Sequence, residues 1–305
     1  MKERDTPFLE RKRMTSLGEA LAKRLEALGS PLVSDYVLFR EMWAVFERGE
    51  ARYLRGEYPS REQFQRTRAL LKQERVIIND ADYGRMWRVL SVSDEPADEI
   101  VCLADPHGYI SHLSAMQRYG LTERRPEALF LTLPAAALVK ELNAQLFASD
   151  YQGRLPEGDV YVPPLKNIAH PKRVRKRLLN TYSTRRYGKF RRLRGKHARI
   201  ATIGQTFLDM LDLPARCGGM LHVLSVWAES APIYLEEIIA RVDAAQDPIL
   251  KVRAGYILDE QLGITDRRVL AWKSFAQRGS SRVLDPGEPF RETHSEEWML
   301  SINVG

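Results

Sequence analysis

A run of positive charge in the second half of the chain is the first candidate for chemistry with a ligand. Between Pro171 and Arg199 the sequence has thirteen Lys or Arg residues and no Asp or Glu. Such a density of like charge repels itself unless a polyanion is at hand, which favours nucleic acid as a partner over a merely solvated surface. The candidate phosphate-binding residues of this stretch are Arg173, Arg175, Arg177, Arg185, Arg186, Lys189, Arg191, Arg192 and Arg194.

A second group of polar side chains lies on one predicted helix in the first third of the chain. Ser60 followed by Gln63 is a capping-box pattern, which opens a helix that continues to Lys72. Three residues are spaced to face inward, namely Phe64, Thr67 and Leu71. The opposite face carries side chains that bond phosphates or base edges, namely Arg61, Gln65, Arg68 and Lys72.

A β-hairpin is predicted directly after this helix. The segment VIINDADYGRMWRVLSV contains two short strands joined by an Asn-Asp-Ala-Asp turn and Gly84, and Arg85 and Arg88 belong to the second strand. Helices followed by a polar-faced helix and a hairpin are the pattern of a winged helix-turn-helix, in which both groups of side chains would contact DNA. The periodicity is equally compatible with a small structural α+β unit whose charged face is only solvated.

The short motifs of common catalytic and cofactor chemistry are missing from the sequence. It contains no GxxxxGK[ST], GxGxxG, HExxH or GxSxG, and its six histidines lack ligand spacing. Asp209 and Asp212 lie one helical turn apart, but Asp212 directly precedes Leu213 and Pro214, where a helix should end. We interpret both as structural surface charges, and we expect no catalysis, no cofactor and no metal.

The hydrophobic pattern predicts a mixed α/β (α+β) protein of two domains. We expect a winged helix-turn-helix DNA-binding domain over residues 14–92 and a larger mixed domain, with a β-layer and a helical C-terminal part, over residues 93–305. In the first domain, helices are predicted at 14–29 and from Pro31 to Gly49. The basic stretch is expected to form strands of the second domain, with its cationic side chains pointing outward.

The composition of the chain indicates its cellular compartment and the class of its partners. The chain has 305 residues, 44% of them hydrophobic, and a formal charge of +7, which favours polyanionic partners. No segment approaches the ~20 apolar residues of a membrane span, and the charged start MKERDTPFLERKR is unlike a signal peptide. We therefore expect a cytoplasmic protein without membrane contact. Cys102 and Cys217 match no metal or redox spacing and are expected to be buried thiols.

Four stretches of the sequence form an ordered set: GYISHLSAMQRYGLTERRP, GQTFLDMLDLPARCGG, DPILKVRAGYILDEQLG and EEWMLSIN. In this order they resemble the recurring signatures of AbiEi-type antitoxins from type IV toxin-antitoxin systems, and the match covers roughly residues 94–305. In the N-terminal third, the helix around Asp35 to Arg48 and the loop to Pro59 are longer than the family pattern.

The resemblance implies a bacterial antitoxin and transcriptional autorepressor of an abortive-infection system, which defends against phage. Its winged helix would bind inverted repeats in its own promoter, and its C-terminal domain would counter a nucleotidyltransferase-like toxin without a stable complex. The basic stretch would then belong to the β-layer of the C-terminal domain and either extend the DNA footprint or bind RNA.

Two alternatives to the antitoxin hypothesis stay open. One is an RNA-binding protein that shields tRNA, with Tyr182, Tyr187 and Phe190 stacking on bases. The other is an enzyme that reverses the modification made by the toxin, which the absence of an acid or metal constellation in the sequence disfavours.

Overall fold

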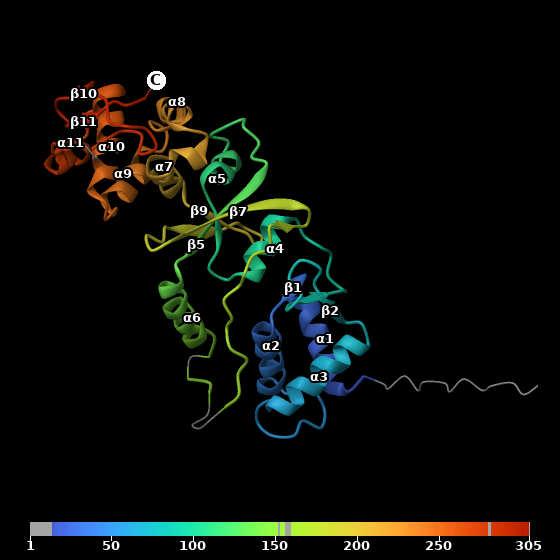
Figure 1. The fold of residues 1–305 in the computed structure, drawn as a ribbon. Coiled ribbons are helices and arrows are strands. Elements are labelled where there is room, and N and C mark those ends of the chain that lie inside the picture. The colour runs from blue at the N-terminus through green and yellow to red at the C-terminus, as the bar shows by residue number, and fades with distance from the viewer. Residues whose placement is uncertain (1–13, 152, 156–159, 280–281, 305) are drawn as a thin grey trace, which may run out of the picture. The chain divides into compact units, whose positions relative to one another are not determined.

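The computed structural model describes residues 14–151, 153–155, 160–279 and 282–304 of the chain. The chain is a mixture of helices and strands, which confirms the predicted α+β class, and it divides into two compact units (Figure 1). One unit contains the residues up to Pro96 together with Leu142–Ala169, and the other contains Ala97–Glu141 and the residues from His170 on. The sequence analysis assigned residues 142–169 to the second domain, whereas in the structure they pack with the first unit.

The first unit begins with three helices and a small antiparallel sheet. In chain order its elements are α1 (Ser16–Leu28), β1 (Leu32–Val33), α2 (Asp35–Glu47), α3 (Arg61–Gln73), β2 (Ile77–Asn79) and β3 (Trp87–Val89). The strand order is β1-β3-β2, with antiparallel pairing throughout, so the predicted hairpin is confirmed. The second helix begins at Asp35 rather than near Pro31, because Leu32 and Val33 pair with β3 and the Ser34 side chain caps the helix.

The core of the first unit forms where the apolar stripes of its helices meet. Leu21 and Leu25 of α1 and Phe39 of α2 are fully buried, together with Phe64 and Leu71 of α3. Thr15 caps the start of α1, and Gly29 ends that helix in the left-handed conformation with a φ of 63°. The stripes have the spacing of one helical face, so each helix buries its apolar side and leaves its polar side in water.

Two tyrosines that follow the second unit's part of the chain, Tyr151 and Tyr161, pack their rings against aromatic residues of α2 and α3. Tyr151, at the end of α6 (Ala136–Tyr151), meets Tyr36 and Trp43 edge to face, with ring centroids 6.2 and 5.7 Å apart. Tyr161 meets the rings of Phe39 and Phe64 at 5.7 and 6.4 Å. These contacts bury large apolar surfaces and explain why residues 142–169 belong to this unit although they are distant in sequence.

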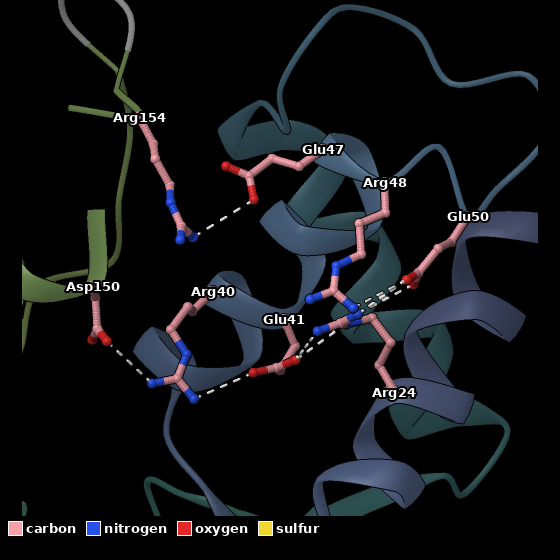
Figure 2. A network of polar contacts seen from close by, with 8 residues as sticks. All are labelled: Arg24, Arg40, Glu41, Glu47, Arg48, Glu50, Asp150 and Arg154. Carbon is pink, nitrogen blue, oxygen red and sulfur yellow. Dashed lines mark hydrogen bonds and ion pairs between the residues drawn. The ribbon is translucent and has the colours of Figure 1, made fainter. Parts of the chain in front are cut away.

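A network of ion pairs adds polar contacts between the same helices (Figure 2). The buried carboxylate of Glu41 accepts hydrogen bonds from Arg24 of α1 at 2.7 Å and from Arg40 at 3.2 Å. Arg24 also binds Glu50, and Arg40 binds Asp150 of α6 at 3.4 Å. Because Glu41 has two guanidinium partners, its charge is compensated within the unit.

The second unit contains a six-stranded mixed sheet. In chain order, α4 (Ala97–Ala104) precedes the first strand of the sheet, and α5 (His112–Arg118) connects its first two strands. The strands are β4 (Tyr109–Ile110), β5 (Ala128–Pro134), β6 (Arg173–Val174), β7 (Arg177–Thr184), β8 (Phe190–Arg192) and β9 (Arg199–Ala201). Their order is β6-β7-β5-β4-β9-β8, in which β5 is parallel to β7 and β4 to β9.

The rest of the second unit is mainly helical. Its elements are α7 (Ile203–Asp212), η1 (Pro214–Cys217), α8 (Met220–Ser230), α9 (Leu235–Asp243), α10 (Pro248–Gly255), η2 (Tyr256–Gln261), α11 (Arg267–Ala271), η3 (Trp272–Phe275), β10 (His294–Ser295) and β11 (Leu300–Ser301). Trp227, Trp272 and Trp298 are buried in its core. At Gly204 the packing of α7 against α9 leaves no room for a side chain, since a Cβ there would lie 2.2 Å from the Glu237 carbonyl oxygen.

Both cysteines lie in the interior of the second unit. Cys102 and Cys217 are free and buried, as predicted, and burial raises the pKa of each thiol. Across the described ranges, no helix is long and apolar enough to cross a membrane.

Candidate nucleic-acid interface

The polar face of α3 is presented to solvent by the packing of its opposite face. Ser60 Oγ accepts a hydrogen bond from the Gln63 amide at 3.2 Å, and Gln63 Oε1 accepts from the Ser60 amide at 2.8 Å, so the predicted capping box is confirmed. The three inward-facing residues are buried, as predicted. Arg61, Gln65 and Lys72 are consequently exposed, and Arg68 is half-buried.

Arg68 has an internal partner that the sequence analysis missed. Its Nη1 lies 2.7 Å from Asp35 Oδ2, while Trp87 Nε1 donates to Asp35 Oδ1, also at 2.7 Å. The guanidinium lies 5.6 Å from the centroid of the Trp87 ring. Asp35 thus joins α2, α3 and β3, and Arg68 helps to hold α3 in place. In sequence, Asp35 is only an acidic residue in the first turn of a helix, a position favoured by the helix dipole, so nothing pointed to Arg68.

Arg88 is also used inside the unit. Its guanidinium donates to the carbonyl oxygens of Pro31 at 3.2 Å and Val92 at 2.7 Å, and also to that of Val89. Only 14% of its side chain is exposed. A guanidinium bound to three carbonyl groups would have to give up these bonds before it could reach DNA.

The turn of the hairpin is built by two short polar side chains. Asp80 is buried, and its Oδ1 accepts hydrogen bonds from the amides of Asp82 at 3.0 Å and Tyr83 at 2.9 Å. Asn79 Nδ2 donates to the Gly84 carbonyl at 2.9 Å. This bonding pattern shapes the turn and leaves Arg85 exposed beside it.

The basic stretch is divided by the topology of the sheet. Strands β6 and β7 lie at one edge of the sheet and β8 lies at the other, with β5, β4 and β9 between β7 and β8. Four inter-strand spacings of about 4.8 Å separate β7 from β8 by roughly 19 Å. The exposed cations therefore do not form the single strip that the sequence suggested, and Arg199 of β9 is buried.

The cations from Arg185 to Arg194, which follow β7 and flank β8, differ in how freely they can bind a ligand. Arg186 is paired with Asp247 at 2.7 Å and Asp212 at 3.6 Å, and Arg191 lies over the Tyr119 ring and donates to its hydroxyl oxygen at 3.3 Å. Four other exposed side chains make no hydrogen bond or ion pair within the described part of the chain, namely Arg185, Lys189, Arg192 and Arg194. These four form the free group of the stretch.

The cations at the β6–β7 edge are less exposed as a set. Arg173 is exposed and donates to the Lys176 carbonyl at 3.0 Å, whereas Arg175 and Arg177 are half-buried. This edge therefore presents fewer accessible guanidinium groups than the β8 edge.

The aromatic residues of the stretch pack inside the second unit. Phe190 stacks on Tyr109 with ring centroids 5.1 Å apart and an interplanar angle of 16°. The Tyr187 hydroxyl donates to the His107 carbonyl, and the Tyr182 ring lies under the Arg216 guanidinium at 5.4 Å. All three rings thus have partners inside the second unit, which disfavours their stacking on bases.

No family model matches this chain, and the comparison with curated proteins gave no match. The similarity to AbiEi-type antitoxins therefore rests on the four sequence stretches and stays a prediction.

A buried carboxyl group lies beneath the start of β8. Gln205 accepts a hydrogen bond from the Lys189 amide at 3.2 Å, and its Nε2 donates to Asp209 Oδ1 at 2.6 Å. Asp209 Oδ2 is shielded from solvent and has no hydrogen-bond partner among the described residues. Burial raises the pKa of Asp209 to about 7; the Gln205 hydrogen bond lowers it and the charge of Asp212 raises it. The interpretation of Asp209 as a surface charge is thus wrong, because α7 turns this residue inward.

Proposed function

We propose that this chain is a DNA-binding autorepressor and the antitoxin of a type IV toxin-antitoxin system, acting in the cytoplasm. The observation that carries the DNA-binding half is the exposed polar face of the capped helix α3, directly before an antiparallel hairpin. The order helix, strand, helix, helix, strand, strand, with sheet order β1-β3-β2, supports a winged helix-turn-helix. In helix-turn-helix proteins the helix in the position of α3 enters the major groove.

The side chains of α3 suit that groove chemically. Arg61 can donate two hydrogen bonds to O6 and N7 of a guanine, and Gln65 can bond N6 and N7 of an adenine, each contact being worth about 1–3 kcal/mol of discrimination. Lys72 and Arg85 supply charge for phosphates, which fixes position without reading sequence. Arg68 keeps α3 in its orientation through Asp35. Two copies of such a domain would bind the two halves of an inverted repeat in the promoter.

The antitoxin half of the proposal is supported by the four family-like stretches, which lie in the second unit. Lys189, Arg192 and Arg194 at the β8 edge, all of them in the free group, would give this unit a surface for phosphate contacts that do not depend on sequence. The toxin would be a nucleotidyltransferase-like enzyme that the antitoxin counters without a stable complex.

The DNA-binding proposal is tested by binding of the full chain to its own promoter and to unrelated duplex DNA. The variant R61A/Q65A should lose at least about tenfold of its preference for the promoter, because two base contacts are removed. K23A, which removes an exposed cation from α1, should bind like the wild type. Equal preference in R61A/Q65A and the wild type would show that α3 does not read the sequence.

The same measurement with tRNA at two salt concentrations separates the RNA-binding alternative. A protein that shields tRNA should prefer tRNA to promoter DNA at both concentrations. The proposed autorepressor should prefer its promoter, and salt should weaken its contacts to both polymers.

A further inference from the structure

The loop between α2 and α3 is held in place at both ends. Gly49 ends α2 with a φ of 60°. The Arg52 amide then donates to Ser16 Oγ at the start of α1 at 2.8 Å. Gln63, the capping residue of α3, donates through Nε2 to the Arg55 carbonyl at 2.9 Å. The loop is therefore tied to α1 and to the first turn of α3 through its backbone.

Side chains of the same loop add to this anchorage. Leu54 packs against the core of the first unit, and Pro59 is buried. Tyr58 stacks on Trp43 with an interplanar angle of 15° and ring centroids 5.8 Å apart. Three other side chains of the loop are exposed, namely Arg52, Tyr53 and Arg55.

Tyr53 occupies a position that packing does not explain. It is 95% exposed, and its φ of 59° lies in the left-handed region, which disfavours residues other than Gly and Asn. A single exposed aromatic needs no special cause. A tyrosine that gains no packing in a strained conformation, with an exposed arginine on each side of it in the sequence, fits a contact with a ligand instead.

The charge around the loop favours an anionic ligand. Arg52 and Arg55 form no side-chain hydrogen bond or ion pair with any other residue that the structure describes. Of the two acidic residues of the loop, Glu50 is bound by Arg24 (Figure 2), which leaves Glu57 as an exposed carboxylate. The N-terminus of α3, to which Arg55 is hydrogen-bonded, adds the positive end of a helix dipole.

We propose that Arg52, Tyr53 and Arg55 form a phosphate-contacting cluster that fixes the register of α3 on duplex DNA. The proposal rests on the proposed function of α3. Guanidinium groups bind phosphates with two hydrogen bonds, and a tyrosine hydroxyl donates one. Because the loop is tied to the first turn of α3, such contacts would set where Arg61 and Gln65 meet the bases.

The test is fluorescence anisotropy of the full chain with labelled promoter duplex and labelled unrelated duplex at several salt concentrations. Alanine at Arg52 and Arg55 preserves the anchoring bonds, since these use the amide of one residue and the carbonyl of the other. R52A/R55A should weaken binding to both duplexes by the same factor. It should also reduce the slope of log affinity against log salt by about 1.8, which is ~0.9 for each lost contact.

Tyr53 is tested by two substitutions, one of which keeps the backbone strain while the other relieves it. Y53F keeps the ring and the strain but removes the hydroxyl, and should weaken binding to both duplexes about fivefold. Y53N suits the left-handed backbone, so its Tm should be equal to or above that of the wild type while its binding weakens as much. K23A is the charge control and should match the wild type.

The outcomes separate this proposal from the proposed function of α3. The loop proposal is overturned if R52A/R55A binds with wild-type affinity and salt slope while R61A/Q65A loses its promoter preference. In that case α3 remains the element that recognises the bases. A changed promoter preference in R52A/R55A at a wild-type salt slope would show that the loop reads bases rather than phosphates, which also overturns the proposal. A wild-type protein that binds neither duplex would overturn both proposals.

Discussion

The carboxyl group of Asp209 should make the stability of the second unit depend on pH near neutrality. An aspartic acid in an unfolded chain has a pKa of about 3.9, whereas burial raises the pKa of Asp209 to about 7 in the folded protein. Between these two values the folded state holds a proton that the unfolded state has released. The unfolding free energy from this group is therefore largest below about pH 4, falls as the pH rises, and levels off above about pH 7.

The size of the effect follows from the pKa difference. A rise of about three pKa units corresponds to about 4 kcal/mol, at 1.36 kcal/mol per unit. This is an upper limit, because other atoms of Asp209 are partly accessible even though Oδ2 is shielded. Screening by that solvent reduces the expected change to about 2 kcal/mol. The substitution D209N removes the ionisable group and keeps the Oδ1 acceptor for Gln205.

The assay is urea unfolding of the wild type and D209N at pH values from 5 to 8, followed by tryptophan fluorescence. Hydrogen exchange of the α7 amides identifies the unit that unfolds. D209N should gain about 1.3 kcal/mol relative to the wild type between pH 5 and pH 7, which is about two-thirds of the full change, since only the wild type must ionise a buried carboxyl group. D212N keeps Asp209 but should show a smaller pH dependence than the wild type, because the charge of Asp212 raises the pKa of Asp209. A constant difference between D209N and the wild type over this range would refute the assignment.

Two further predictions concern packing and charge in the second unit. G204A should lower the unfolding free energy by about 1–3 kcal/mol, because a Cβ would overlap the Glu237 carbonyl; G84A, which meets no atom within 4 Å, is the control in thermal unfolding. The triple variant K189A/R192A/R194A removes three exposed cations at the β8 edge. It should reduce the slope of log affinity against log salt by about 0.9 per lost contact, on DNA and RNA alike, and leave promoter preference intact. A wild-type slope would show that this edge binds no nucleic acid.

Local patterns in the sequence predicted the elements that depend on neighbours in the chain. The capping box at Ser60 and Gln63 and the burial of Phe64 and Leu71 are confirmed. These features involve residues three or four positions apart, so the sequence contains all of the information. The start of α2 was predicted too early, because a two-residue strand is recognised only by its pairing with β3, more than fifty residues later.

Features that depend on distant residues were not predictable from such patterns. Nothing near Tyr161 indicates that its ring meets Phe39 and Phe64. The charge of the basic stretch was visible, but its division between two sheet edges follows from strand order. The inward turn of Asp209 likewise follows from the packing of α7.

The partners of each guanidinium change which part of α3 is expected to meet DNA. Arg68, in the second half of the helix, is bound to Asp35, and Arg88 of the hairpin is bound to backbone carbonyls. The accessible guanidinium groups lie toward the start of the helix, where Arg61 is exposed with its guanidinium 5.3 Å from the Tyr161 ring centroid, and the anchored loop presents Arg52 and Arg55. In helix-turn-helix proteins the N-terminal residues of the recognition helix contact base edges. The loss of DNA affinity in R68A should therefore be compared with the loss in D35A, because both variants release α3 from α2. An equal loss of affinity in the two variants would show that Arg68 positions α3 and does not contact DNA.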